Sequence, residues 1–202
     1  MRQTEREKIV ERMPFESRLG FVAFCVERCL AEARRHQPAR EQLANLPWIE
    51  EGLAMLWARA EQGVSPDRER AEAIRAHLAG YESPDADGEN VRYNYDVALV
   101  SCARELRNGL RIALDPEEAD PDVVASAIDG PDQAVGAIYA DWESSQAAEV
   151  ELLDTALQRL KKLGRKPFSR AALADIPEWH RGALSPQYAE GRLTGTDVNR
   201  DL

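Results

Sequence analysis

Several features that would assign this 202-residue chain to a familiar class are scarce or missing. Its three cysteines are too few, and odd in number, for a disulfide framework. No run of about 18 apolar residues is present that could cross a membrane. The N-terminal stretch MRQTEREKIVERM carries alternating charges and lacks the apolar segment of a signal peptide. These absences predict a cytoplasmic protein.

The chain also lacks the motifs of common catalytic and metal sites. It contains no G-x-S-x-G, no P-loop and no G-x-G-x-x-G. No Glu has a His three residues later, the spacing that a di-iron helical bundle needs. Cys25, Cys29 and His36 share one helical face, but their neighbours are apolar and a fourth zinc ligand is not visible. We therefore expect packed thiols, no metal and no cofactor.

Composition predicts the fold class. Hydrophobic residues make up 44% of the chain and aromatic residues 6%, and strong helix formers outnumber β-branched residues. Apolar spacing near 3.6 predicts helices over about residues 4–13, 14–36, 43–62, 67–79, 91–114 and 131–163. We predict an all-α, single-domain multi-helix bundle of about seven or eight helices. It spans residues 1–183 and is followed by an irregular C-terminal tail, 184–202.

Particular residues mark the expected boundaries. Thr4 and Glu7 have capping-box spacing, Pro47 divides the third predicted helix, and Ser65-Pro66-Asp67 begins the next with proline in its first turn. Asp115-Pro116, Asp120-Pro121 and Gly130-Pro131 are three successive start signals, and residues 82–90 have the composition of an exposed loop. Trp142 lies on the apolar stripe of the long last helix. Glycines inside predicted helices indicate close helix packing: Gly20, Gly52, Gly109 and Gly136.

Cations are missing from one long folded segment. Residues 112–158 hold twelve acidic side chains and no Lys or Arg, in a chain of net charge -10. Such a field repels phosphate backbones and anionic lipid, and it attracts a basic protein. Nucleic acid and membrane are therefore not expected as partners.

Two interpretations of these acids stay open. Favourable positions near helix N-termini account for Asp115, Glu117, Glu118, Asp120, Asp122 and Asp132. They do not account for Asp141, Glu143, Glu149, Glu151 and Asp154, which have no cation at helical spacing until Arg159. The acids form either a solvated face or a docking face. The candidate partner-binding residues are Asp115, Glu117, Glu118, Asp122, Asp141, Glu143, Glu149, Glu151 and Asp154.

Four segments carry a resemblance. FVAFCVERCL at 21–30, LAMLW at 53–57, YDVALVSCARELRNGL at 95–110 and DWESSQAAEVELLDTALQRLKKLG at 141–164 resemble, in that order, the YjaG-like family of small all-helical bacterial proteins. The region after Lys166 departs from that family, and residues 66–90 match it loosely. The family implies no established activity. In class, the chain is also similar to immunity proteins of bacterial polymorphic toxin systems.

We therefore predict a non-enzymatic protein-binding protein, specifically an immunity protein that neutralises a cognate toxin through an acidic helical surface. The expected partner is a basic toxin effector domain. The alternative is an uncharacterised helical enzyme with a carboxylate-lined pocket between the helix of Tyr93 and Tyr95 and that of Trp142. The sequence leaves the oligomeric state open.

Overall fold

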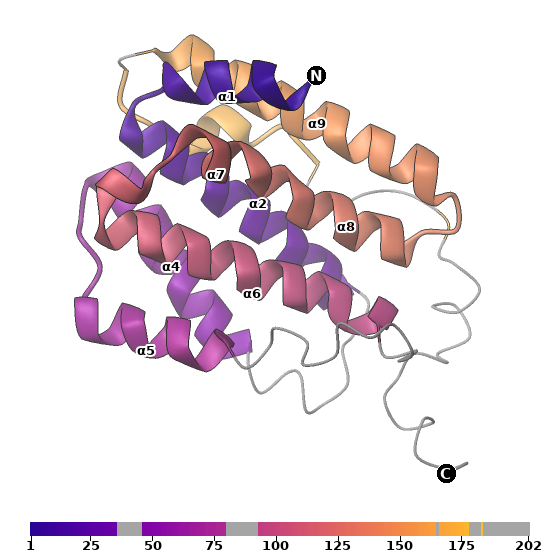
Figure 1. Cartoon of the computed structure of the whole chain (residues 1–202), viewed down its shortest axis with the longest axis horizontal. Coiled ribbons are helices and arrows are strands. Elements are labelled where there is room, and N and C mark those ends of the chain that lie inside the picture. The colour runs from indigo at the N-terminus through magenta and orange to yellow at the C-terminus, as the bar shows by residue number, and fades with distance from the viewer. Residues whose placement is uncertain (36–45, 80–92, 165, 178–182, 184–202) are drawn as a thin grey trace.

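The computed structural model describes residues 1–35, 46–79, 93–164, 166–177 and 183, and Figure 1 shows their arrangement. These residues form eight α-helices and three 3-10 helices, with no β-strand among them. The all-α bundle of about seven or eight helices is confirmed. The α-helices are α1 (Gln3–Glu11), α2 (Phe15–Arg35), α4 (Leu46–Gln62), α5 (Arg68–Ala79), α6 (Tyr93–Leu114), α7 (Pro121–Ala125), α8 (Asp129–Ile138) and α9 (Trp142–Leu163). The 3-10 helices are η1 (Pro116–Glu118), η2 (Ser126–Ile128) and η3 (Arg170–Leu173).

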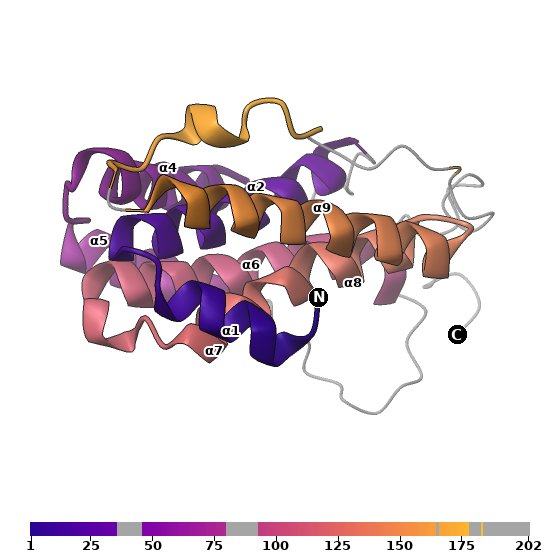
Figure 2. The same cartoon turned by 90° about the horizontal axis from the view of Figure 1, so that it is seen from above.

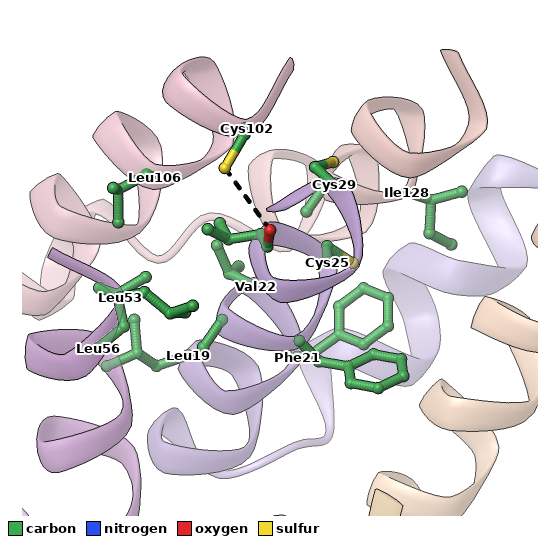
Figure 3. Packing of buried hydrophobic residues seen from close by; sticks show 14 of the residues in the cluster. Leu19, Phe21, Val22, Cys25, Cys29, Leu53, Leu56, Cys102, Leu106 and Ile128 are labelled. Carbon is green, nitrogen blue, oxygen red and sulfur yellow. Dashed lines mark hydrogen bonds between the residues drawn. The ribbon is translucent and has the colours of Figure 1, made fainter. Parts of the chain in front are cut away.

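Helix α2 lies at the centre of the bundle. It packs against α4, α6 and α8, while α5 covers α6 and α4, and α1 packs against both α7 and α9. The sequence of α2 explains this position, because apolar residues surround its axis instead of forming a single stripe. Leu19, Phe21, Val22 and Cys25 are all buried (Figure 3).

Helices α4 and α6 approach each other closely at two reciprocal contacts. The Leu106 side chain of α6 faces Gly52 of α4, and a Cβ at Gly52 would lie 2.9 Å from its Cδ2. The Leu56 side chain of α4 faces Gly109 of α6 in the same way, with Cδ1 at 2.6 Å from a Cβ there. The prediction that these two glycines mark close helix packing is confirmed.

The aspartate start signals are largely confirmed. Asp120 accepts a hydrogen bond from the Asp122 amide at 2.9 Å, and Asp67 accepts one from the Arg70 amide at 2.7 Å. Gly63 and Gly164, both with positive φ, follow the ends of α4 and α9. Pro66 lies outside the first turn of α5. Pro47 lies in the first turn of α4, and the part of the predicted helix before Leu46 lies outside the described residues.

Two other predicted boundaries are wrong. The capping carboxylate of α1 is Glu5, which accepts from the Arg2 amide at 3.0 Å, instead of Glu7. The long helix predicted over 131–163 is two helices, because Tyr139 has extended backbone (φ -98, ψ 146) and Asp141 caps a new helix. The predicted exposed loop 82–90, the predicted tail 184–202 and His36 lie outside the described residues.

Candidate functional site

The exposed members of the predicted acidic site lie at two ends of the bundle. Glu117 and Glu118 lie in η1, which follows the end of α6, and Asp115 directly precedes it; all three are exposed. Asp141 and Glu143 are exposed at the start of α9, beyond α8. Figure 1 shows that η1 and the α8–α9 connection lie at opposite ends. The structure therefore does not bring these acids together on a single face.

Helix α1 separates two further predicted acids. Asp122 is exposed at the start of α7 and accepts a hydrogen bond from Gln3 Nε2 at 3.3 Å. Asp154 on α9 is half-buried and accepts from Arg6 Nε at 2.8 Å, which makes it an ion-pair partner of α1. Glu151, one turn earlier on α9, is exposed. Arg6, distant in sequence, thus offsets the charge of Asp154, which has no cation nearby along its own helix.

The prediction that Glu149 lies on an exposed face is wrong. Its side chain is 1% exposed, and both carboxylate oxygens accept hydrogen bonds from the Arg28 guanidinium, with Nη2 to Oε2 at 2.6 Å. Arg28 Nη1 also donates to the Pro177 carbonyl. A bidentate guanidinium–carboxylate pair of this kind explains why a charged residue can lie in the core. Glu149 therefore stabilises the packing of α2 against α9 and is not available to a partner.

More polar groups line the buried side of α2. The Tyr139 hydroxyl donates to Glu32 Oε2 at 2.8 Å, and Arg104 Nε donates to Glu105 Oε1 at 2.8 Å. Burial raises the pKa of Glu105 to about 7, and the Arg104 guanidinium opposes this shift. A carboxyl with a pKa near neutrality is suited to proton exchange. Glu105 is only 3% exposed, however, and a ligand does not reach it in this conformation.

The cysteines lie in the same core and have unreactive thiols. Cys25, Cys29 and Cys102 are buried, and burial raises the pKa of each thiol. Cys102 Sγ donates to the Val26 carbonyl at 3.6 Å (Figure 3). Such thiols stay protonated and are poor nucleophiles and poor metal ligands. Within the part of the chain that the structure describes, no group of three or more His, Cys, Asp or Glu is arranged to hold a metal ion.

Trp142 is the feature of this region that sequence reasoning misplaced. Predicted on an apolar stripe, it is 54% exposed and is the first residue of α9, between Asp141 and Glu143. Trp57, by contrast, is buried and stacked on Phe168, and Trp48 is half-buried and stacked on His77. The Asp141 side chain accepts from the Ser144 amide at 3.3 Å, an N-cap spacing that could have revealed the helix break. Trp142 then lies outside the apolar period of α9.

Helix α8 fills the space expected for an enzyme pocket. It packs against both α6 and α9, and Figure 1 shows it lying between them. Ala134, Val135 and Ile138 of α8 are buried in this contact region. The side chains of Tyr93 and Tyr95 lie outside the described residues.

Comparisons of the chain with protein-family models, curated proteins and solved structures give no match. The resemblance to the YjaG-like family thus stays a prediction. No helix among the described residues has both the length and the apolar character needed to cross a bilayer.

Proposed function

We propose that this chain binds a basic protein partner at the α8–α9 end of the bundle, and that it serves as an immunity protein neutralising a cognate toxin. The exposed indole of Trp142 carries the proposal. Tryptophan is enriched among the residues that dominate binding energy at protein interfaces. An indole 54% exposed at the first position of a helix contributes little to the core of its own bundle.

The acids beside Trp142 fit the same role. The helix N-terminus accounts for Asp141 as a cap and for Glu143 in the first turn, so these carboxylates alone do not indicate a partner. Around an apolar anchor, however, they supply a rim of negative charge. Rim charges steer a partner of opposite charge and suppress partners of like charge. The net charge of -10 acts in the same direction over longer distances.

Paired substitutions test the docking site. Trp142→Ala is expected to weaken binding to a purified basic partner by tenfold or more, measured by calorimetry or surface plasmon resonance. Val64→Ala is the control, because Val64 is 53% exposed and lies in the α4–α5 connection, at the opposite end of the bundle from the start of α9 (Figure 1). Equal affinities of the two variants would remove Trp142 as the anchor.

Co-expression tests the immunity role separately. The candidate toxin is the product of a reading frame adjacent to the gene for this chain. Growth of a host expressing that toxin should be restored by the wild-type chain and by Val64→Ala, and much less by Trp142→Ala at equal protein levels. If no adjacent product is toxic, the immunity role fails even where another partner binds at Trp142.

A further inference from the structure

The segment after α9 covers part of α2 and leaves a cavity beneath it. Figure 2 shows the η3 segment crossing above α2 and α9. It is anchored at Gly20 of α2, where a Cβ would lie 2.4 Å from Cζ of the Phe168 ring. The same ring stacks on Trp57 of α4 with 5.9 Å between centroids. Since glycine at position 20 lets the ring approach, η3 is held close over α2.

The cavity has a volume of about 480 Å³ and is lined by α2 and by residues 170–176. Its α2 residues recur at helical spacing and include Phe24, Arg28, Ala31 and Arg34. The space exists because small side chains face each other across it, Ala31 on one wall and Ala171 and Ala174 on the other. This volume falls within the usual range of small-molecule pockets.

The charge of the lining is opposite to that of the molecule. Among the described lining residues are three arginines, Arg28, Arg34 and Arg170, and one acid, Glu27, in a chain of net charge -10. The buried side chains of Phe24, Leu173 and Ile176 add an apolar surface. A cationic rim above an apolar floor is complementary to an anion with an apolar body.

Two of the arginines can exchange partners and the third cannot. Arg34 pairs with Glu50 and Arg170 with Glu27, and the side chains of both arginines are about half exposed. Exposed ion pairs contribute little to stability, so a ligand anion can replace the carboxylates at small cost. Arg28 also lines the cavity, but its guanidinium is held by Glu149 and the Pro177 carbonyl. Arg170 also lies over the Trp57 ring, 4.8 Å from its centroid, which limits where its guanidinium can move.

We propose that this cavity, the arginine cleft, binds a small amphipathic anion whose carboxylate or phosphate head pairs with Arg34 and Arg170 while its apolar body rests on Phe24 and Ile176. The site is on a different part of the molecule from Trp142. Ligand binding in the arginine cleft is therefore independent of the proposed partner docking at Trp142.

Calorimetry with four soluble probes tests the chemistry of the ligand. Octanoate or octyl phosphate is expected to bind to the wild-type protein, and a difference between them shows which head group the cleft prefers. Octanol lacks the charge and inorganic phosphate lacks the apolar body, so both should bind at least tenfold more weakly. Binding of octanol equal to that of both anions, or no binding of either octyl anion at millimolar concentration, overturns the proposal.

Matched double variants test the location. Arg34→Gln with Arg170→Gln should weaken binding of the octyl anion at least tenfold, and Ala31→Leu should weaken it by filling the cavity without changing charge. Arg68→Gln with Arg75→Gln is the control, because these α5 arginines also form exposed ion pairs, with Asp115 and Glu72. Circular dichroism and urea unfolding confirm that each variant is folded. Equal weakening by the two arginine pairs would mean binding governed by net charge, and the cleft would be rejected.

Discussion

Arg28 and Glu149 form a bidentate ion pair across the α2–α9 contact, although they are 121 residues apart in the chain. Both side chains are at least 97% removed from solvent, at 3% and 1% exposed. Burying two charges is costly, and their attraction offsets that cost only while both are present. The pair thus fixes which faces of α2 and α9 meet, and each charge depends on the other.

A double-mutant cycle tests this dependence. Arg28→Met and Glu149→Leu should each lower the free energy of unfolding by about 3 to 5 kcal/mol, because each leaves one buried charge without its partner. The double variant should be much more stable than the sum of the two losses predicts. Urea unfolding followed by circular dichroism gives the three values. Simple additivity of the two losses would show that the residues do not act as a pair.

Glu105 gives the fold a pH dependence. Its pKa is about 7 in the folded protein, above the ordinary 4.5, so the folded state binds this proton more tightly than the unfolded state. Its contribution to stability is therefore complete below about pH 4.5 and is lost as the pH rises through about 7. The loss builds up between about pH 4.5 and 7 and reaches roughly 3 to 4 kcal/mol, since one pKa unit corresponds to about 1.4 kcal/mol.

The variant Glu105→Gln isolates this effect, because the amide has the same shape and does not titrate. Its free energy of unfolding should exceed that of the wild type at pH 8 and approach or fall below it at pH 5. Urea unfolding at several pH values measures both curves. Parallel curves for the two proteins would assign the pH dependence to another group, with Asp132 next, since burial raises its pKa as well.

The reciprocal glycine contacts between α4 and α6 predict a cost for added methyl groups. Gly52→Ala and Gly109→Ala should each destabilise by about 1 to 3 kcal/mol, because overpacking against Leu106 and Leu56 exceeds the gain in helix propensity. Gly136→Ala is the control. The three atoms nearest to a Cβ there all belong to the Gln146 side chain, whose amide can move at the loss of one hydrogen bond to the Asp132 carbonyl. Thermal unfolding midpoints that rank the three variants equally would contradict this packing argument.

Local sequence signals predicted much of the fold. Asp120-Pro121 predicted the start of α7, and the apolar spacing located α2 and α6 to within a few residues. These features depend on neighbours in the chain, where propensity and capping act. The sequence did not predict the break at Tyr139, because apolar residues keep helical spacing across it. The capping signal of Asp141 is weaker than that spacing.

The candidate site was harder to predict because it depends on distant contacts. Glu149 has no cation at helical spacing along α9, and its partner Arg28 comes from α2. Asp154 likewise pairs with Arg6 of α1. The spacing of residues along the sequence shows only which side chains are neighbours on the same helix. It cannot distinguish an acid that pairs with a cation on another helix from an acid that faces solvent. The arginine cleft was missed for the same reason, since residues 24–34 and 170–176 meet only in the folded chain.

The ion pairs of Glu149 and Asp154 decide which acids can be used to test docking. Amides at Glu149 or Asp154 would break ion pairs with Arg28 or Arg6, and any change in binding would be confused with a change in stability. Asp141 and Glu143 are free of this problem, because both are exposed beside Trp142 and Asn retains the cap at position 141. Removing these two charges therefore tests docking without changing an ion pair among the described residues.

Asp141→Asn with Glu143→Gln should slow association with the basic partner several-fold and flatten its salt dependence, while dissociation changes little. Rim charges act mainly on the encounter rate, and salt screens them over about 10 Å at 0.1 M. Glu117→Gln with Glu118→Gln removes the same charge at the opposite end of the bundle and should leave the rate nearly unchanged. Stopped-flow mixing over a range of salt concentrations measures both. Equal slowing by the two pairs would mean that net charge alone attracts the partner, and the α8–α9 end would be rejected as the docking site.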